Sequence, residues 1–344
     1  MSVLAVQTMD LALARFPAAL LPDGGAGTLR RAAPAVAADV VVYFECRLAG
    51  SDRAVDVSQH FFAADGGAGR LLALARRQSG PAWSRLAAFA GAWAEDPALA
   101  AITEIGLEHD EGVAAPAVFA AFDGTVLDGI AAGERFVAAM APEGLEGWRT
   151  LVSTLEIAVA HGLTPGRMVG VMLSRDAQLR CMIRDLETDR VRRFLAEAGW
   201  PGDIDRLADL MGRGPLVGDA TRLVLGFTPA LAPDLGFEVI HPRDEAGEAA
   251  QSALLDWLAG TGLAEPARVE AAAGWRGAVT PMDRALPWPE TLISRDLATA
   301  RGRLDAFSAF ISHVKLNLKD GAPLPAKAYL ALAPVRSPEL TAHA

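Results

Sequence analysis

Three apolar segments of the chain contain basic or polar residues at even spacing. These residues are Arg180, Arg184, Lys315, Asn317, Lys327 and Tyr329. Residues two or four positions apart on a β-strand point to the same side of a sheet. Fixed cations together with a phenol hydroxyl can bind a diphosphate and stabilise its charge as it leaves. We therefore expect this set to bind an anion; the alternative is that its charges pair with acids inside the protein.

Glu108 and His313 are the candidate acid–base residues. Glu108, in the segment ITEIGLEH, could accept a proton from a nucleophile, or it could pair with an arginine. His313 alternates with Lys315 in HVKLNL, which predicts that both side chains point the same way. Tyr43 and Glu238 occupy polar positions of two further alternating segments, and both are candidate substrate-binding residues.

No metal site is predicted. The run Glu108-His109-Asp110-Glu111 offers suitable ligands, but neighbouring residues of a strand point to opposite faces and cannot converge on one ion. The six histidines are scattered, and there is no aspartate-rich D-D-x-x-D motif, no phosphate loop and no G-x-S-x-G elbow. We expect no cofactor, with magnesium entering at most through a bound diphosphate.

Ten strand-like segments come in five pairs, and each pair is joined by a short turn. The segments are 40–48, 54–62, 102–109, 118–122, 167–175, 179–185, 222–227, 236–240, 313–318 and 327–332. A short connection forces neighbouring strands to be antiparallel, because a parallel crossover needs a dozen or more residues. The sequence therefore predicts five hairpins.

Pairs of helices are predicted between these hairpins. Val191, Phe194 and Leu195 lie on one face of a helix that Gly199 ends, and Asp203 is placed to cap the next helix. The same two-helix pattern fits three longer segments, and one further helix follows them. They are 70–96 with a break at Gly80, 133–161 with a break at Pro142, 246–273 with a break at Gly260, and 291–310.

Five helix-strand-strand-helix repeats predict a single α/β (α+β) domain over residues 1–344, built as a ten-stranded antiparallel barrel with helices outside. Closure removes the exposed edges of so long a sheet, and ten strands leave a lumen too wide for side chains to fill. If the apolar strand faces meet the helices, the polar faces line the lumen. The lumen set is Tyr43, Glu45, Arg47, Glu104, Glu108, Arg180, Met182, Arg184, Glu238, His313, Lys315, Asn317, Lys327 and Tyr329.

All three lysines of the chain lie in its last predicted hairpin. Alternation places Lys315 and Lys327 in the lumen and Lys319 in the solvated turn. A buried cation needs an acid or a ligand anion to compensate its charge, and Glu238 is the candidate acid for Lys315. We expect Lys315 and Lys327 to be required for activity and Lys319 to be dispensable.

The composition excludes several classes of function. A formal net charge of −10 argues against a nucleic-acid partner, which requires clustered positive charge. No segment reaches the about 18 apolar residues that a membrane span needs, and the first residues do not resemble a signal peptide. We therefore expect a cytoplasmic protein with no membrane span. Cys46 and Cys181 each lie in an apolar strand and are predicted to be buried and free.

The order of these elements resembles the aromatic prenyltransferase barrel, known as the PT-barrel or ABBA fold, over nearly the whole chain. The run EIGLEHD around Glu108 resembles the strand that carries a catalytic glutamate in fungal indole prenyltransferases. The pairs Arg180/Arg184 and Lys327/Tyr329 are similar to strands that hold the diphosphate in that family. The segments GWPGD and AKAYLAL resemble uncharacterised bacterial members.

This resemblance implies a biosynthetic transferase of secondary metabolism. It would transfer an allylic prenyl group from a diphosphate to an aromatic or other nucleophilic small molecule or peptide. The family shields its allyl cation with several lumen tyrosines, whereas this chain has only two. Two alternatives therefore stay open. One is a barrel enzyme without prenyl transfer (an isomerase, cyclase or hydrolase), and the other is a non-catalytic protein that binds a small molecule or peptide.

Overall fold

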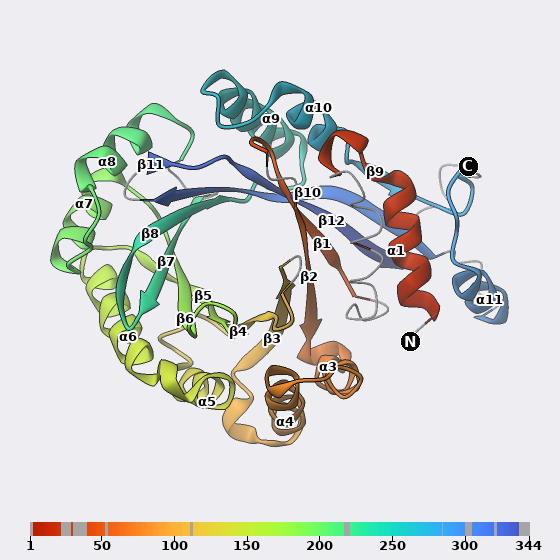
Figure 1. The fold of residues 1–344 in the computed structure, drawn as a ribbon, viewed down its shortest axis with the longest axis horizontal. Coiled ribbons are helices and arrows are strands. Elements are labelled where there is room, and N and C mark those ends of the chain that lie inside the picture. Colours follow the sequence, from red (N-terminus) through yellow and green to blue (C-terminus); the bar gives the residue numbers. More distant parts are fainter. Residues whose placement is uncertain are drawn as a thin grey trace.

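Ten strands pair edge to edge and close into an antiparallel barrel (Figure 1). The structure is a computed structural model, and it describes residues 3–21, 29, 40–51, 54–110, 113–216, 221–283, 285–299, 305–319 and 322–336. Neighbouring strands follow the order β10-β12-β1-β2-β3-β4-β5-β6-β7-β8, and pairing of β8 with β10 closes the ring. The predicted closed, ten-stranded antiparallel barrel is thus confirmed.

Each of the ten predicted strands is present in the barrel. They are β1 (Val42–Arg47), β2 (Val55–Phe62), β3 (Ile102–His109), β4 (Ala117–Phe122), β5 (Thr164–Met172), β6 (Gln178–Arg184), β7 (Thr221–Thr228), β8 (Ala230–Val239), β10 (Asp305–Lys319) and β12 (Lys327–Arg336). Two short strands, β9 (Gly277–Val279) and β11 (Ala322–Pro323), add to β10 outside this ring.

The predicted helix over 291–310 is wrong in its second half. The helix there, α11, covers Glu290–Thr299, and residues 300–304 lie outside the described part of the chain. Residues from Asp305 onward belong instead to β10, which pairs with β12 along one edge and with β9 along the other. Local sequence is a weak guide in such a segment, because strand formation depends on the partners that tertiary structure supplies.

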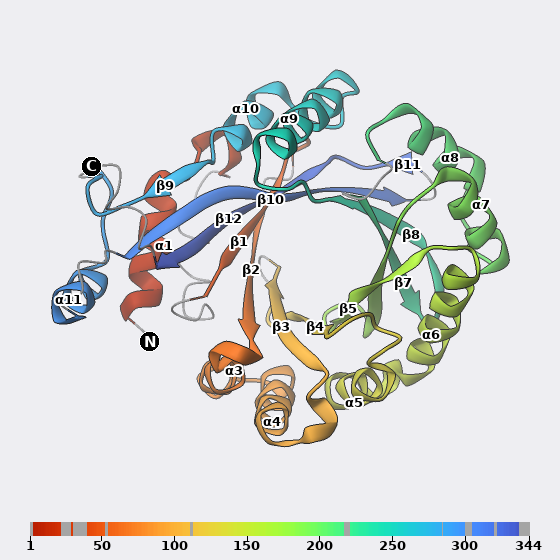
Figure 2. The same cartoon turned by 180° about the vertical axis from the view of Figure 1, so that it is seen from behind.

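Ten α-helices occur in the described residues, and they cover the outside of the barrel (Figures 1 and 2). Besides α11 they are α1 (Val3–Arg15), α3 (Gly67–Ala75), α4 (Pro81–Glu95), α5 (Ile130–Met140), α6 (Leu145–Ala160), α7 (Thr188–Glu197), α8 (Ile204–Arg213), α9 (Glu245–Gly260) and α10 (Pro266–Ala273). The predicted helix breaks at Gly80, Pro142 and Gly260 are confirmed. Asp203 caps α8 by accepting a hydrogen bond from the backbone N–H of Arg206 (3.0 Å).

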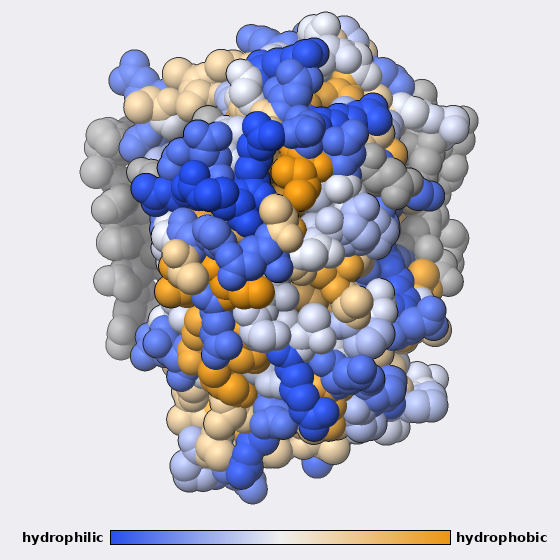
Figure 3. Space-filling view, turned by 90° about the vertical axis from the view of Figure 1, so that its left-hand side faces the viewer, coloured by the Kyte–Doolittle hydropathy of each residue, from blue (hydrophilic) through white to orange (hydrophobic). Residues whose placement is uncertain are grey.

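Apolar side chains of the strands and helices meet between the two layers. Val169, Cys181 and Leu223 are buried on the outer faces of their strands, as alternation predicts. Buried tryptophans connect helices to strands by hydrogen bonds from their indole N–H groups. Trp93 of α4, for example, donates to the carbonyl of Ile102 in β3. On the side that carries α7, the outer surface of the protein mixes polar residues with apolar ones (Figure 3). None of the described helices is long and apolar enough to span a membrane.

The turn between β5 and β6 holds two non-glycine residues in the left-handed region, Asp176 (φ 48°) and Ala177 (φ 54°). This conformation costs a residue with a Cβ roughly 1–2 kcal/mol, whereas glycine adopts it freely. We expect Ala177→Gly to raise the free energy of unfolding by about 0.5–1 kcal/mol, after the extra chain entropy of glycine is subtracted. Urea denaturation measures the change. Ala198→Gly, at φ −69°, is the matched control and should destabilise the protein.

Candidate active site

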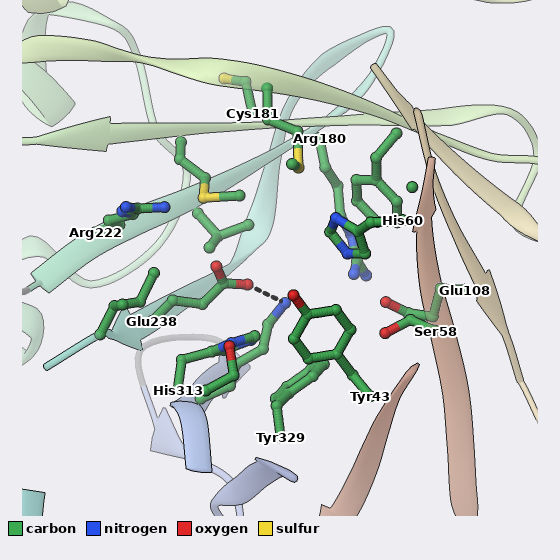
Figure 4. A pocket seen from close by; sticks show the side chains of 18 of the residues that line it. Tyr43, Ser58, His60, Glu108, Arg180, Cys181, Arg222, Glu238, His313 and Tyr329 are labelled. Atoms are coloured by element: carbon green, nitrogen blue, oxygen red, sulfur yellow. Dashed lines mark hydrogen bonds and ion pairs between the residues drawn. The ribbon is translucent and has the colours of Figure 1, made fainter. Parts of the chain in front are cut away.

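The lumen of the barrel contains a cavity of about 180 Å³, and its wall collects most of the predicted site residues (Figure 4). Strands β1, β2, β3, β6, β7, β8, β10 and β12 all contribute side chains. The predicted residues that line it are Tyr43, Glu108, Arg180, Glu238, His313, Lys315 and Tyr329. Seven side chains that alternation assigned to the lumen therefore line one cavity.

Three predicted residues do not line this cavity. Asn317 lies in a second cavity of about 200 Å³, which shares Arg180 and Lys315 with the first. Lys327 binds Glu45. Arg184 lies close enough to Arg222 to lower the pKa of that residue. The predicted diphosphate-binding set is therefore divided along the barrel axis, because the tilt of the strands places residues of one face at different depths.

Lys315 forms a buried ion pair with Glu238. Its Nζ donates to Oε1 of Glu238 at 2.9 Å, and both side chains are about nine-tenths buried. Burial alone would raise the pKa of Glu238, but Lys315 and His313 lower it to about 2. The pair confirms Glu238 as the acid partner of Lys315, and it neutralises one of the cations predicted to bind an anion.

Glu45 is the centre of a second buried network. It accepts hydrogen bonds from Lys327 Nζ and from the hydroxyl of Tyr329, and Arg47 lies 3.4 Å away. Although burial opposes ionisation, Lys327 and Arg47 hold the pKa of Glu45 well below its usual range. Tyr329 therefore stays protonated and directs its O–H toward Glu45. Lys327 is neutralised in the same way as Lys315.

Glu108 differs from the other lumen acids. Among the described residues, none donates a hydrogen bond to its carboxylate or forms an ion pair with it. Burial raises the pKa of Glu108 to about 7, and repulsion by Glu45 adds to this effect, while Lys315 and Arg180 oppose it. A carboxyl group with this pKa is part protonated and part ionised at neutral pH, as a general acid or base should be.

Two of the arginines that line the cavity lack an acid partner among the described residues. Arg180 and Arg222 line the cavity, and neither forms an ion pair with a described residue. Burial lowers the pKa of Arg222, and Arg184 and Arg167 lower it further by repulsion. The Nε atom of Arg184 is buried and has no partner within the described chain. Like charges gathered in this way are stabilised by a bound anion.

Aromatic rings form part of the cavity wall. His313 stacks on Tyr329 with ring centroids 3.9 Å apart, and Tyr43 packs against His60 at 4.9 Å. Burial lowers the pKa of His313 to about 4, so its imidazole is neutral at pH 7. Burial, together with Glu104, raises the pKa of Tyr43 to about 12. Both tyrosines of the chain thus contribute neutral rings to the same cavity.

Four polar residues of the wall were absent from the predicted set: Ser58, His60, Arg222 and Ser312. The alternation rule could have found the first three, whereas Ser312 lies at the irregularity between Ile311 and His313, where the alternation of β10 is broken. The segment AVDVSQHFF shows alternation, with Val55 and Val57 buried outside.

No group of three or more His, Cys, Asp or Glu residues in the described ranges could hold a metal ion. Glu111, part of the run considered above, lies outside those ranges. Cys46 and Cys181 are buried and free, as predicted, and burial raises the pKa of both thiols.

Comparison with protein-family models found no match for the chain, and no curated protein sequence matches it.

Proposed function

We propose that the protein is a transferase of the aromatic prenyltransferase barrel type, which moves an allylic prenyl group from a diphosphate to a nucleophilic small molecule or peptide. One observation carries the proposal. A single lumen cavity contains a carboxyl group of pKa about 7, Glu108, together with Arg180 and Arg222, and none of the three forms an ion pair with a residue in the described part of the chain. Ionising a diphosphate and removing a proton from the nucleophile require these two kinds of group.

We assign diphosphate binding to the arginines and not to the lysines. Arg180 and Arg222 face the cavity, Arg184 lies near Arg222, and a guanidinium binds phosphate oxygens through two parallel hydrogen bonds. As the carbon–oxygen bond of the donor breaks, its electron pair leaves with the diphosphate, whose growing charge the arginines stabilise. Lys315 and Lys327 keep their acid partners throughout.

The aromatic wall suits the allyl cation that remains. The faces of Tyr43 and Tyr329 attract a cation, and the neutral imidazole of His313 does not repel it. The nucleophile then forms a bond to the allylic carbon and loses its proton to Glu108. A pKa of about 7 allows Glu108 to accept this proton and to release it before the next turnover.

The size of the cavity favours a short donor. An apolar cavity of about 150 Å³ can hold benzene, so one of about 180 Å³ has room for a five-carbon chain. Dimethylallyl diphosphate is therefore the expected donor.

Dimethylallyl diphosphate and inorganic pyrophosphate should both raise the melting temperature, because a ligand that binds the native state stabilises it by mass action. Arg222→Met is expected to weaken pyrophosphate binding at least tenfold, since a hydrogen bond to a charged group contributes about 1.5–3 kcal/mol. Isothermal titration calorimetry measures the affinity. Arg213→Ala, on the outside of α8, is the control and should bind like the parent. Millimolar ligand without any stabilisation would contradict the diphosphate assignment.

A second candidate is a barrel enzyme without prenyl transfer, such as an isomerase, cyclase or hydrolase. The observation that favours it is the pairing of Lys315 with Glu238 and of Lys327 with Glu45, which removes two cations from diphosphate binding but leaves Glu108 available for acid–base chemistry. A protein that binds neither diphosphate nor pyrophosphate would support this alternative.

A further inference from the structure

Glu108 of β3 and Arg180 of β6 face the same part of the lumen cavity. Both line it, and Arg180 reaches across to the side of the wall that carries His60 and Glu108 (Figure 4). Neither forms an ion pair with a residue in the described ranges. Arg180 nevertheless favours the ionised form of Glu108 by its charge, as Lys315 does. Because Arg180 is also assigned to the diphosphate, one guanidinium faces both the carboxyl group and the donor.

The groups around Glu108 carry charges of both signs. They are Glu45 on β1, Asp110 after β3, Arg175 at the β5–β6 turn, Arg180 on β6, Lys315 on β10 and the neutral hydroxyl of Tyr329 on β12. Lys315 is paired with Glu238, and Arg175 is paired with Asp110. Arg180 is therefore the cation of this set that has no acid partner among the described residues.

A diphosphate on Arg180 changes the electrostatics of Glu108. It takes up the hydrogen bonds of the guanidinium and places negative charge beside the carboxyl group. Two negative groups that share a site repel each other, so the carboxyl group is driven toward its protonated form. Glu45 adds to the repulsion, because Lys327 and Arg47 keep it ionised. Donor binding should therefore favour the neutral form of Glu108.

The transfer step needs both a proton donor and a proton acceptor. When the carbon–oxygen bond breaks, its electron pair stays on the diphosphate oxygen, and a proton placed there neutralises part of the new charge. The nucleophile loses a proton when its bond to the allylic carbon forms. Both events take place in the cavity that Glu108 lines. One carboxyl group can thus supply the first proton and take up the second.

We propose that Glu108 is the general acid of the reaction as well as its base: it is neutral in the donor complex, gives its proton to the departing diphosphate oxygen, and recovers a proton from the nucleophile. This inference rests on the proposed function, to which it adds a second catalytic role for the same residue. Atoms and charges balance, because one proton moves from the nucleophile to the diphosphate through Glu108. A residue that acted only as a base would have to be ionised in the donor complex.

Positional isotope exchange separates the two roles, because it follows ionisation of the donor without an acceptor. Dimethylallyl diphosphate with oxygen-18 in its bridging position scrambles the label when the carbon–oxygen bond breaks and re-forms. Glu108→Gln keeps the shape of the neutral carboxyl group but cannot give up a proton, so it should slow scrambling at least about tenfold. A residue that served only as a base would leave this rate unchanged. Glu134→Gln, on an exposed position of α5, is the control and should scramble like the parent.

Pyrophosphate binding tests the protonation state without any reaction. Given a pKa of about 7, about one-tenth of Glu108 is neutral at pH 8, so a site that requires the neutral form binds about tenfold more weakly in the parent than in Glu108→Gln. At pH 6 the two proteins should bind alike. Calorimetry at pH 8 in two buffers of different ionisation enthalpy should show that the parent takes up about one proton more per bound pyrophosphate than the variant.

The proposal is overturned if Glu108→Gln scrambles the donor at the parental rate, or if parent and variant bind pyrophosphate alike at pH 8. The pH profile of the parent needs no variant: its scrambling rate should fall at high pH as the acid form is lost, and a rate that rises with pH would contradict the acid role. Failure of the proposed function looks different. A parent protein that neither binds pyrophosphate nor scrambles the donor does not ionise a diphosphate, and both proposals then fall.

Discussion

Lys315→Ala is expected to lower the free energy of unfolding by about 3–5 kcal/mol, because it leaves the Glu238 carboxylate buried without its partner. The two groups lie 2.9 Å apart, and the pKa of Glu238 is lowered to about 2 from an ordinary value of 4.5. A lowered carboxyl pKa stabilises the native state above pH 4.5, and this stabilisation is lost as pH falls toward 2. The difference between parent and variant should therefore shrink over that interval, as urea denaturation at several pH values can measure.

The controls for this prediction come from the same hairpin. Lys319 is exposed, so Lys319→Ala should unfold like the parent. The double change Lys315→Met with Glu238→Gln should recover most of the lost stability, because no uncompensated charge remains. From the sequence, Lys315 was expected to be needed for activity. A Lys315→Ala protein of parental stability but no turnover would restore that interpretation.

Glu108→Gln is expected to reduce transfer by about 10²–10⁴-fold, the usual contribution of a general base. The stability of the Glu108→Gln variant provides an independent test of the pKa of Glu108. The pKa of Glu108 is about 7 in the native state against 4.5 ordinarily, so the native protein binds this proton more tightly than the unfolded chain does. The free energy of unfolding of the parent should therefore fall as pH rises from 4.5 to 7. That of the variant should fall by roughly 2–3 kcal/mol less.

Denaturation of parent and Glu108→Gln proteins at pH 4.5 and pH 8 measures this difference. Glu134→Gln, on an exposed position of α5, is the control and should follow the parent at both values. If Glu108→Gln is no more stable than the parent at pH 8, the carboxyl does not hold its proton in the native state. A variant that gains stability and keeps full turnover would show that the buried carboxyl is not the base.

The sequence by itself determined the kind of barrel and the inward or outward direction of its side chains. Paired strands with short turns can form only hairpins, and a proline such as Pro81 or Pro142 is disfavoured in a helix interior, so it marks a helix boundary. Alternation is a local property of the strand, so it placed Glu108, Arg180 and Tyr329 in the lumen without knowledge of their neighbours. Asp203 could be predicted as a helix cap for the same reason.

Tertiary structure alone decided which of these side chains meet. Lys327 and Glu45 are 282 residues apart in sequence, and they come together because β12 closes against β1. Strand register and tilt set the depth of each residue along the barrel axis, and neither can be read from alternation. Lys315 and Lys327 therefore form ion pairs with acids inside the barrel, whereas Arg222 and His60 line the cavity. The first half of β10 is a strand for the same reason: its partners, β9 and β12, come from other parts of the chain.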